Sequence, residues 1–188
     1  MAGTLLHAGV LTPGTNIPAT AGPLTPGAIV GGPLVVNHSG TTGLLVDLTT
    51  TVWSGVAENP YPGGYTFTYE LAVVGGSALN HLSSSIVNYG GGIPQIDAYW
   101  ANPATVGGAD EIDWAADASR LHLLNDIAIG ATETLVVHTS ATAFTQGTFG
   151  VTQGVADNTL VPVPEPHEYA LIAGLGLFGF VAYRRMRA

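Results

Sequence analysis

The 188-residue sequence contains no cysteine and no lysine, and four arginines supply all of its formal positive charge. The lack of cysteine excludes a disulfide scaffold, a cysteine-ligated zinc site, a CxxC redox centre and a cysteine nucleophile. The scarcity of cations excludes most electrostatic binding of nucleic acid, because neutralising phosphates requires clustered Lys and Arg side chains. Neither absence argues against export, since mainly small exported domains depend on disulfides.

Thirteen Asp and Glu residues give the chain a formal net charge of -9, and this charge is unevenly distributed. Arg120 is the one Arg of the first 183 residues, whereas Arg184, Arg185 and Arg187 lie within the last five. Residues 1–166 carry twelve acids and one Arg, a net -11, and residues 167–188 carry one acid and three Arg, a net +2. The C-terminal segment therefore differs in charge from everything before it.

Composition divides the chain into residues 1–40, 41–160 and 161–188. The first segment has five prolines and no Asp, Glu, Lys or Arg. Its prolines argue against a helix, because proline lacks the backbone donor that a helix needs. It also lacks the basic start of a secretory signal peptide, and Pro13 and Gly14 interrupt its apolar run. We expect a Pro/Gly-rich lead-in that ends in an edge strand at residues 28–36, where proline is tolerated.

Residues 41–160 alternate apolar and polar side chains, which is typical of half-buried strands. The clearest run is 65–73, where Tyr65, Phe67, Tyr69, Leu71 and Val73 share one face, and we expect the other face to lie in water. Residues 44–52 alternate similarly, and Gly- and Pro-containing turns separate these runs. Residues 113–125 fit a short helix, although 120–124 fit a strand equally well. The predicted fold class is all-β: a single β-sandwich, Ig-like or jelly-roll-like, followed by a single C-terminal transmembrane helix.

Residues 161–188 combine a proline-rich motif, an apolar run and an Arg cluster. The motif is Val163, Pro164, Glu165 and Pro166, and the cluster is Arg184, Arg185 and Arg187. As a helix, the fifteen uncharged residues of the run span about 22 Å, short of the roughly 30 Å hydrocarbon core, and snorkelling Arg side chains and local thinning of the bilayer can close the gap. The positive-inside rule places the Arg cluster in the cytoplasm and the acidic domain outside. The run consists of Tyr169, Ala170, Leu171, Ile172, Ala173, Gly174, Leu175, Gly176, Leu177, Phe178, Gly179, Phe180, Val181, Ala182 and Tyr183.

This three-part tail resembles the PEP-CTERM sorting signal of Gram-negative bacteria. The resemblance implies that an exosortase, a membrane-embedded processing protease, recognises Pro164, Glu165 and Pro166 and cuts near them. The domain then passes from the inner membrane to the cell surface or to an exopolysaccharide matrix. His167 and Glu168 depart from the small or hydroxylated residues common after the motif. Residues 44–53, 59–71 and 134–148 are similar to uncharacterised PEP-CTERM proteins, which supply no known activity.

The sequence indicates no catalytic, cofactor or metal site. The six His residues form no HExxH motif, Ser83, Ser84 and Ser85 lack a GxSxG elbow, and the GxGxxG spacing of residues 174–179 lacks a βαβ unit. The acidic group of Asp110, Glu111, Asp113 and Asp117 lacks the EF-hand pattern, and a solvated acidic loop explains it.

We therefore expect a non-enzymatic, exported structural protein of the cell surface or extracellular matrix. Its expected partners are the exosortase, transiently the membrane, and in addition exopolysaccharide, with no nucleic acid. The alternative is a carbohydrate-binding or adhesion module, with Trp100 and Trp114 as candidate stacking residues among seven aromatics that include Trp53 and Tyr99, although aromatics in an all-β chain are usually core residues. A hydrolase and a permanently anchored membrane protein are less favoured.

Overall fold

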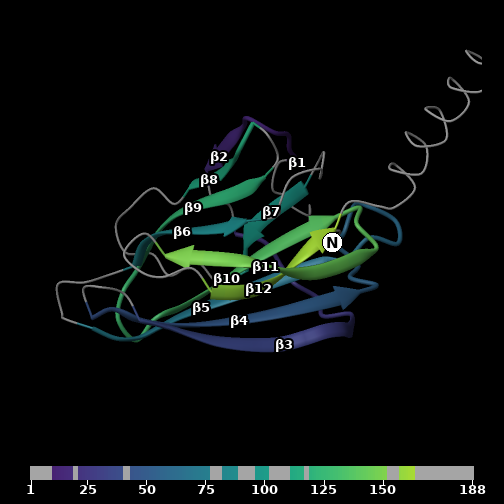
Figure 1. The fold of residues 1–188 in the computed structure, drawn as a ribbon. Coiled ribbons are helices and arrows are strands. Elements are labelled where there is room, and N and C mark those ends of the chain that lie inside the picture. Colours follow the sequence, from purple (N-terminus) through teal and green to yellow (C-terminus); the bar gives the residue numbers. More distant parts are fainter. Residues whose placement is uncertain are drawn as a thin grey trace, which may run out of the picture.

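The structure, a computed structural model, describes residues 10–18, 21–39, 43–76, 82–88, 96–101, 111–116, 119–151 and 157–163. Within these ranges the chain forms twelve strands and no helix (Figure 1). The predicted all-β class is confirmed for this part of the chain. No helix in these ranges is long and apolar enough to cross a membrane. The predicted membrane segment 169–183, the motif residues Pro164, Glu165 and Pro166, and the Arg cluster lie outside the described residues.

The strands form two six-stranded sheets in which every pair of neighbouring strands is antiparallel. The first, sheet A, has the order β1 (Val10–Leu11), β7 (Ile96–Trp100), β10 (Thr132–Thr139), β5 (Thr66–Gly75), β4 (Leu45–Ser54) and β3 (Ala28–Ser39). The second, sheet B, has the order β12 (Asp157–Val163), β11 (Ala143–Val151), β6 (Leu82–Asn88), β9 (Arg120–Ile127), β8 (Glu111–Trp114) and β2 (Asn16–Pro18).

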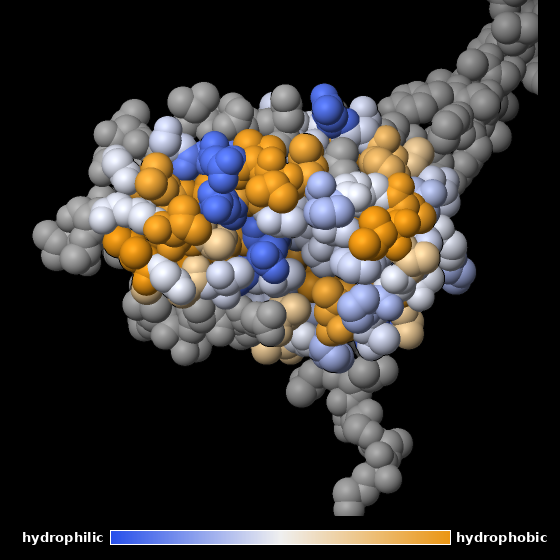
Figure 2. All heavy atoms as spheres, turned by 90° about the horizontal axis from the view of Figure 1, so that it is seen from below, coloured by the Kyte–Doolittle hydropathy of each residue, from blue (hydrophilic) through white to orange (hydrophobic). Residues whose placement is uncertain are grey.

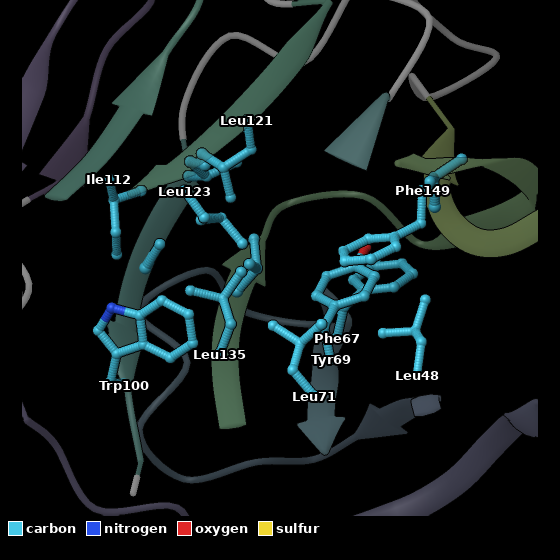
Figure 3. Packing of buried hydrophobic residues seen from close by; sticks show 14 of the residues in the cluster. Leu48, Phe67, Tyr69, Leu71, Trp100, Ile112, Leu121, Leu123, Leu135 and Phe149 are labelled. Atoms are coloured by element: carbon cyan, nitrogen blue, oxygen red, sulfur yellow. The ribbon is translucent and has the colours of Figure 1, made fainter. Parts of the chain in front are cut away.

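The two sheets share one hydrophobic core. Sheet A contributes Phe67, Tyr69 and Leu71 from β5, and sheet B contributes Leu121 and Phe149, all with no exposed surface. Figure 3 shows Phe149 facing the rings of Phe67 and Tyr69 across the core. A hydrogen bond of 2.7 Å between the hydroxyls of Thr50 on β4 and Thr159 on β12 adds a polar link between the sheets. Burying each large apolar side chain contributes about 1.5–3 kcal/mol, so this shared core is what holds the sheets together.

The strands β3, β8 and β9 test local predictions made from the sequence. The edge strand expected at residues 28–36 is confirmed as β3, the outermost strand of sheet A. The strand interpretation of 120–124 is confirmed by β9, and the helix alternative is wrong. Glu111 and Asp113 belong to β8, where they alternate with the buried Ile112 and Trp114, so the predicted acidic loop is corrected to a strand there. Asp110 and Asp117 lie outside the described residues.

β5 differs from its prediction on the outer face of sheet A, the face turned away from the core. The inner face is buried as expected, and Glu70 and Val74 are exposed on the outer face. Thr66 and Thr68, however, are only 0% and 6% exposed, although both lie on the outer face. Two non-strand segments, residues 21–25 and 55–65, cover this end of the sheet and form hydrogen bonds with its strands. The face expected to lie in water is therefore partly buried.

Candidate functional site

The register of sheet A brings residues of four strands, most of them polar, into rows across its outer face. One row is formed by Thr51 of β4, Thr68 of β5, Val136 of β10 and Tyr99 of β7. The row on one side consists of Thr49, Glu70 and Thr134. The row on the other side consists of Trp53, Thr66, His138 and Asp97. Because strand side chains alternate between faces, these rows are the direct consequence of the alternation that builds the core.

A cavity of about 350 Å³ lies over these rows, and we call it the threonine groove. This volume is at the lower end of the roughly 300–1,000 Å³ typical of small-molecule sites. Its sheet side is lined by Thr49, Thr51, Trp53, Thr68, Glu70 and Thr134, and its opposite side by Gly22, Pro23, Leu24 and Ala101.

The surface around β3, seen from below in Figure 2, has hydrophobic and hydrophilic residues side by side. Ile29 and Val35 on β3 are 54% and 58% exposed. Such a mixed surface does not by itself define a binding site, because isolated exposed apolar residues are normal. The groove stands out by its hollow shape rather than by hydrophobicity.

Hydrogen bonds hold one side of the groove in place. The indole Nε1 of Trp53 donates to Thr68 Oγ1 at 3.0 Å, and Thr68 Oγ1 donates to the carbonyl of Thr51 at 3.4 Å. In contrast, the hydroxyls of Thr49 and Thr134 and the carboxylate of Glu70 have no hydrogen-bond partner among the described residues. Thr134 is nonetheless only 8% exposed. The groove thus combines a fixed aromatic edge with polar groups that form no hydrogen bond among the described residues.

The opposite wall is the segment 21–25, which runs beside β7. Gly22 N donates to the carbonyl of Trp100 at 3.0 Å, and the hydroxyl of Tyr99 donates to the carbonyl of Pro23 at 2.6 Å. A Cβ atom on Gly22 would lie 2.6 Å from Cδ2 of Tyr99, so only glycine lets this segment lie on the ring. A backbone hydrogen bond and a side-chain hydrogen bond therefore both anchor this wall to β7.

A polar cluster lies next to the groove and consists of the half-buried Glu58 and Asn59 and the buried Thr66, Tyr99 and His138. Thr66 Oγ1 lies 2.8 Å from His138 Nδ1, and His138 Nε2 lies 3.2 Å from the hydroxyl of Tyr99. Asn59 Nδ2 donates to Thr66 Oγ1 at 3.2 Å and to the carbonyl of Gly64 at 3.1 Å. These bonds tie the segments 55–65 and 21–25 to the outer face, which explains why Thr66 is buried.

Burial and neighbouring groups shift the pKa of two residues of this cluster, Glu58 and Tyr99. Burial acts to raise the pKa of Glu58, but hydrogen bonds from Thr25 and from backbone amides, together with the nearby His138, leave that pKa below its ordinary value. Burial, with the nearby carboxylates of Glu58 and Asp97, raises the pKa of Tyr99 well above its ordinary 10.0. Burial and Asp97 also raise the pKa of Tyr61. The Tyr99 phenol therefore stays protonated and donates to the carbonyl of Pro23, which fits a structural role for the cluster.

The two tryptophans singled out from the sequence lie in the core and not at the surface. Trp100 and Trp114 have no exposed surface and belong to the same apolar cluster as Phe67 and Leu71. Figure 3 shows Trp100 among the core side chains near Leu135 and Ile112. The core interpretation of these aromatics is thus the one observed, and neither ring forms a surface for a sugar.

Trp53, which the sequence did not single out, lines the groove. The available signal was the period-two series Thr49, Thr51 and Trp53, which is the polar face of the 44–53 run. No group of three or more His, Cys, Asp or Glu residues suited to a metal ion occurs in the described ranges. The motif residue Val163 ends β12, and the rest of the tail lies outside those ranges.

Comparison of the chain with protein-family models, with curated proteins and with solved structures finds no match.

Proposed function

We propose that the protein is an exported, non-enzymatic structural protein of the cell surface or the exopolysaccharide matrix of a Gram-negative bacterium. In this proposal a β-sandwich domain, Ig-like or jelly-roll-like, is followed by a C-terminal transmembrane helix at residues 169–183. An exosortase recognises the motif Val163 to Pro166 and cuts near it, so that the inner-membrane attachment is transient.

The observation that carries the proposal is the order of chemical features in the tail. The prolines keep the recognition segment extended, because they cannot continue a helix. The uncharged segment then holds the chain in the bilayer, and Arg184, Arg185 and Arg187 stop translocation. A lipid-anchor signal uses the same logic, with a hydrophobic tail that is removed from the mature protein.

The distribution of Arg supports the same orientation, because the positive-inside rule counts Lys and Arg. The chain up to Pro166 has Arg120 as its one Lys or Arg, whereas three Arg follow the uncharged run of the tail. β12, the edge strand of sheet B, ends at Val163 and so leads directly into Pro164, Glu165 and Pro166. Recognition of the motif would therefore take place at the end of the last strand.

Cell fractionation in hosts with and without an exosortase tests this proposal. We expect the wild-type chain to leave the inner-membrane fraction in the competent host and to remain there in the other. Glu165→Gln should keep the chain in the membrane of the competent host, because it changes the recognised motif. Glu168→Gln is the matched control, since it removes the other acid of the tail without changing the motif, and it should be released. An identical distribution of the wild-type chain in both hosts would favour permanent anchoring and contradict the proposal.

A second candidate function is a carbohydrate-binding or adhesion module of the same exported class. The observation that favours it is the threonine groove, an open cavity with unpartnered polar groups beside a tryptophan. A hydrolase is less favoured, because the lining of the groove contains a single carboxylate, that of Glu70, and no His or Cys.

A further inference from the structure

We propose that the threonine groove is a binding site for a short stretch of neutral polysaccharide. The proposal moves the ligand surface from Trp100 and Trp114, which are buried, to Trp53 and the outer face of β4, β5 and β10. It gives the exported matrix protein proposed above a ligand, and in that respect it rests on that function.

The polar groups of the groove call for a ligand rich in hydroxyls. Glu70 carries a carboxylate, which accepts hydrogen bonds only, whereas the hydroxyls of Thr49 and Thr134 can both donate and accept. A sugar with neighbouring hydroxyls satisfies both kinds of group at once. All three side chains lie in one cross-strand row, because Thr49 pairs with Glu70 and Glu70 with Thr134.

The aromatic side of the groove fits the other face of a sugar. Trp53 is partly exposed and lines the cavity, and an indole combines a flat apolar surface with a polar edge. Its Nε1 is engaged by Thr68, so the ring is held in position before a ligand arrives. Such preorganisation lowers the entropic cost of binding.

Charge favours a neutral ligand over an anionic one. Glu70 is the one charged residue of the lining, no Lys or Arg contributes to it, and the chain as a whole has a net charge of -9. An acidic polysaccharide would therefore meet repulsion both in the groove and at longer range.

A peptide strand is a poorer fit than a sugar. Addition of a strand requires a sheet edge with unpaired backbone groups. The floor of the groove is instead formed by β4, β5 and β10, and each of these strands is paired with a neighbour on both sides. Recognition in the groove must therefore come from side chains.

Calorimetric titration of the full 188-residue chain tests the proposal. A polyoxyethylene detergent is used, since it has no sugar head group that would compete. The probes are neutral trisaccharides of glucose, mannose and galactose, and an acidic trisaccharide of galacturonate. We expect at least one neutral trisaccharide to bind and the acidic one to bind more weakly. Absence of binding by all the neutral probes, or tighter binding of the acidic one, overturns the proposal.

Paired threonine variants locate the site. Thr134→Val should weaken binding of the neutral trisaccharide by about two- to tenfold, the effect of one lost hydrogen bond. Thr132→Val is the matched control, because Thr132 lies two residues away on the same face of β10, is exposed and does not line the groove. The control should bind like the wild type. Equal affinities for Thr134→Val and the wild type overturn the assignment to this groove.

Tryptophan variants test the stacking surface. Trp53→Ala should abolish binding, whereas Trp53→Phe should restore part of it, because a phenyl ring keeps a flat apolar face. Thermal melts establish that each variant is folded, and the threonine pair decides the question if Trp53→Ala is not. Binding is measured without any processing step, so its failure leaves the fractionation result unaffected, and the reverse also holds.

Discussion

The two faces of sheet A are built from the same strands but stabilised in different ways. On the inner face, Phe67, Tyr69 and Leu71 of β5 are completely buried against side chains from sheet B. On the outer face of the same strand, Thr66 is equally buried, but it lies in a network of hydrogen bonds with His138 and Asn59. Four residues further along β5, Glu70 is exposed at the groove.

Burial on the outer face therefore depends on the covering segments 21–25 and 55–65 rather than on apolar side chains. The inner face excludes water by packing, and deletion of a side chain leaves a cavity there. The outer face buries polar groups, which is tolerable only where each finds a partner. Hydrogen bonds therefore hold the covering segments on one end of this face, and Glu70 stays exposed beyond them.

Truncation on the inner face should produce the largest loss of stability. Phe67→Ala is expected to lower the free energy of unfolding by about 3–5 kcal/mol, because it removes a buried ring and leaves a cavity. Urea unfolding of Phe67→Ala and of the neighbouring outer-face variant Thr68→Ala measures the contrast between faces. An equal loss from Thr68→Ala would break the comparison.

Removal of one hydroxyl from the covered outer face should have an intermediate effect. Thr66→Val preserves shape but removes the oxygen that lies 2.8 Å from His138 Nδ1 and accepts from Asn59. Leaving these buried groups without that partner should lower the free energy of unfolding by about 1–3 kcal/mol. Thr132→Val, at the exposed end of the same face, should stay within about 0.5 kcal/mol of the wild type. Equal stability of the two variants would mean that the hydrogen bonds of Thr66 do not hold the segment 55–65 on the sheet.

The smallest effect should appear only in alkali. The pKa of Tyr99 is raised from 10.0 in the folded protein, so above pH 10.0 the unfolded chain binds fewer protons than the folded one. Stability from this residue is therefore complete below pH 10.0 and declines as the pH rises further. Urea midpoints on both sides of pH 10.0 should decline less steeply for Tyr99→Phe than for the wild type. Parallel declines would mean that the phenol is not shielded.

The core of the fold could be predicted from the sequence because strand alternation reports burial directly. The inner faces of β4 and β5 and the edge position of β3 follow from local pattern and proline placement. Burial of Thr66 and His138 could not be predicted in this way, because it depends on residues 21–25 and 55–65, which approach from elsewhere in the chain.

The candidate site shows the same limit. Trp100 and Trp53 are both aromatic residues in or at the end of strands, and the local signal for Trp53 is its alternation with Thr49 and Thr51 on the polar face of its run. The register of β7 and β4 then places Trp100 in the core and Trp53 at the groove. The sorting tail, in contrast, is a linear motif, so its interpretation depends on residue order and not on tertiary contacts.

The most direct test of the proposed function is the intact mass of the protein released by an exosortase-competent host. The account predicts a mass below the 19.2 kDa of the full chain, with residues 169–183 and the Arg cluster missing. The released domain should also be more acidic than the full chain, because the lost residues 169–183 and the Arg cluster contain three Arg and no acid. A released protein with the full mass, still ending in Arg184, Arg185 and Arg187, would contradict it.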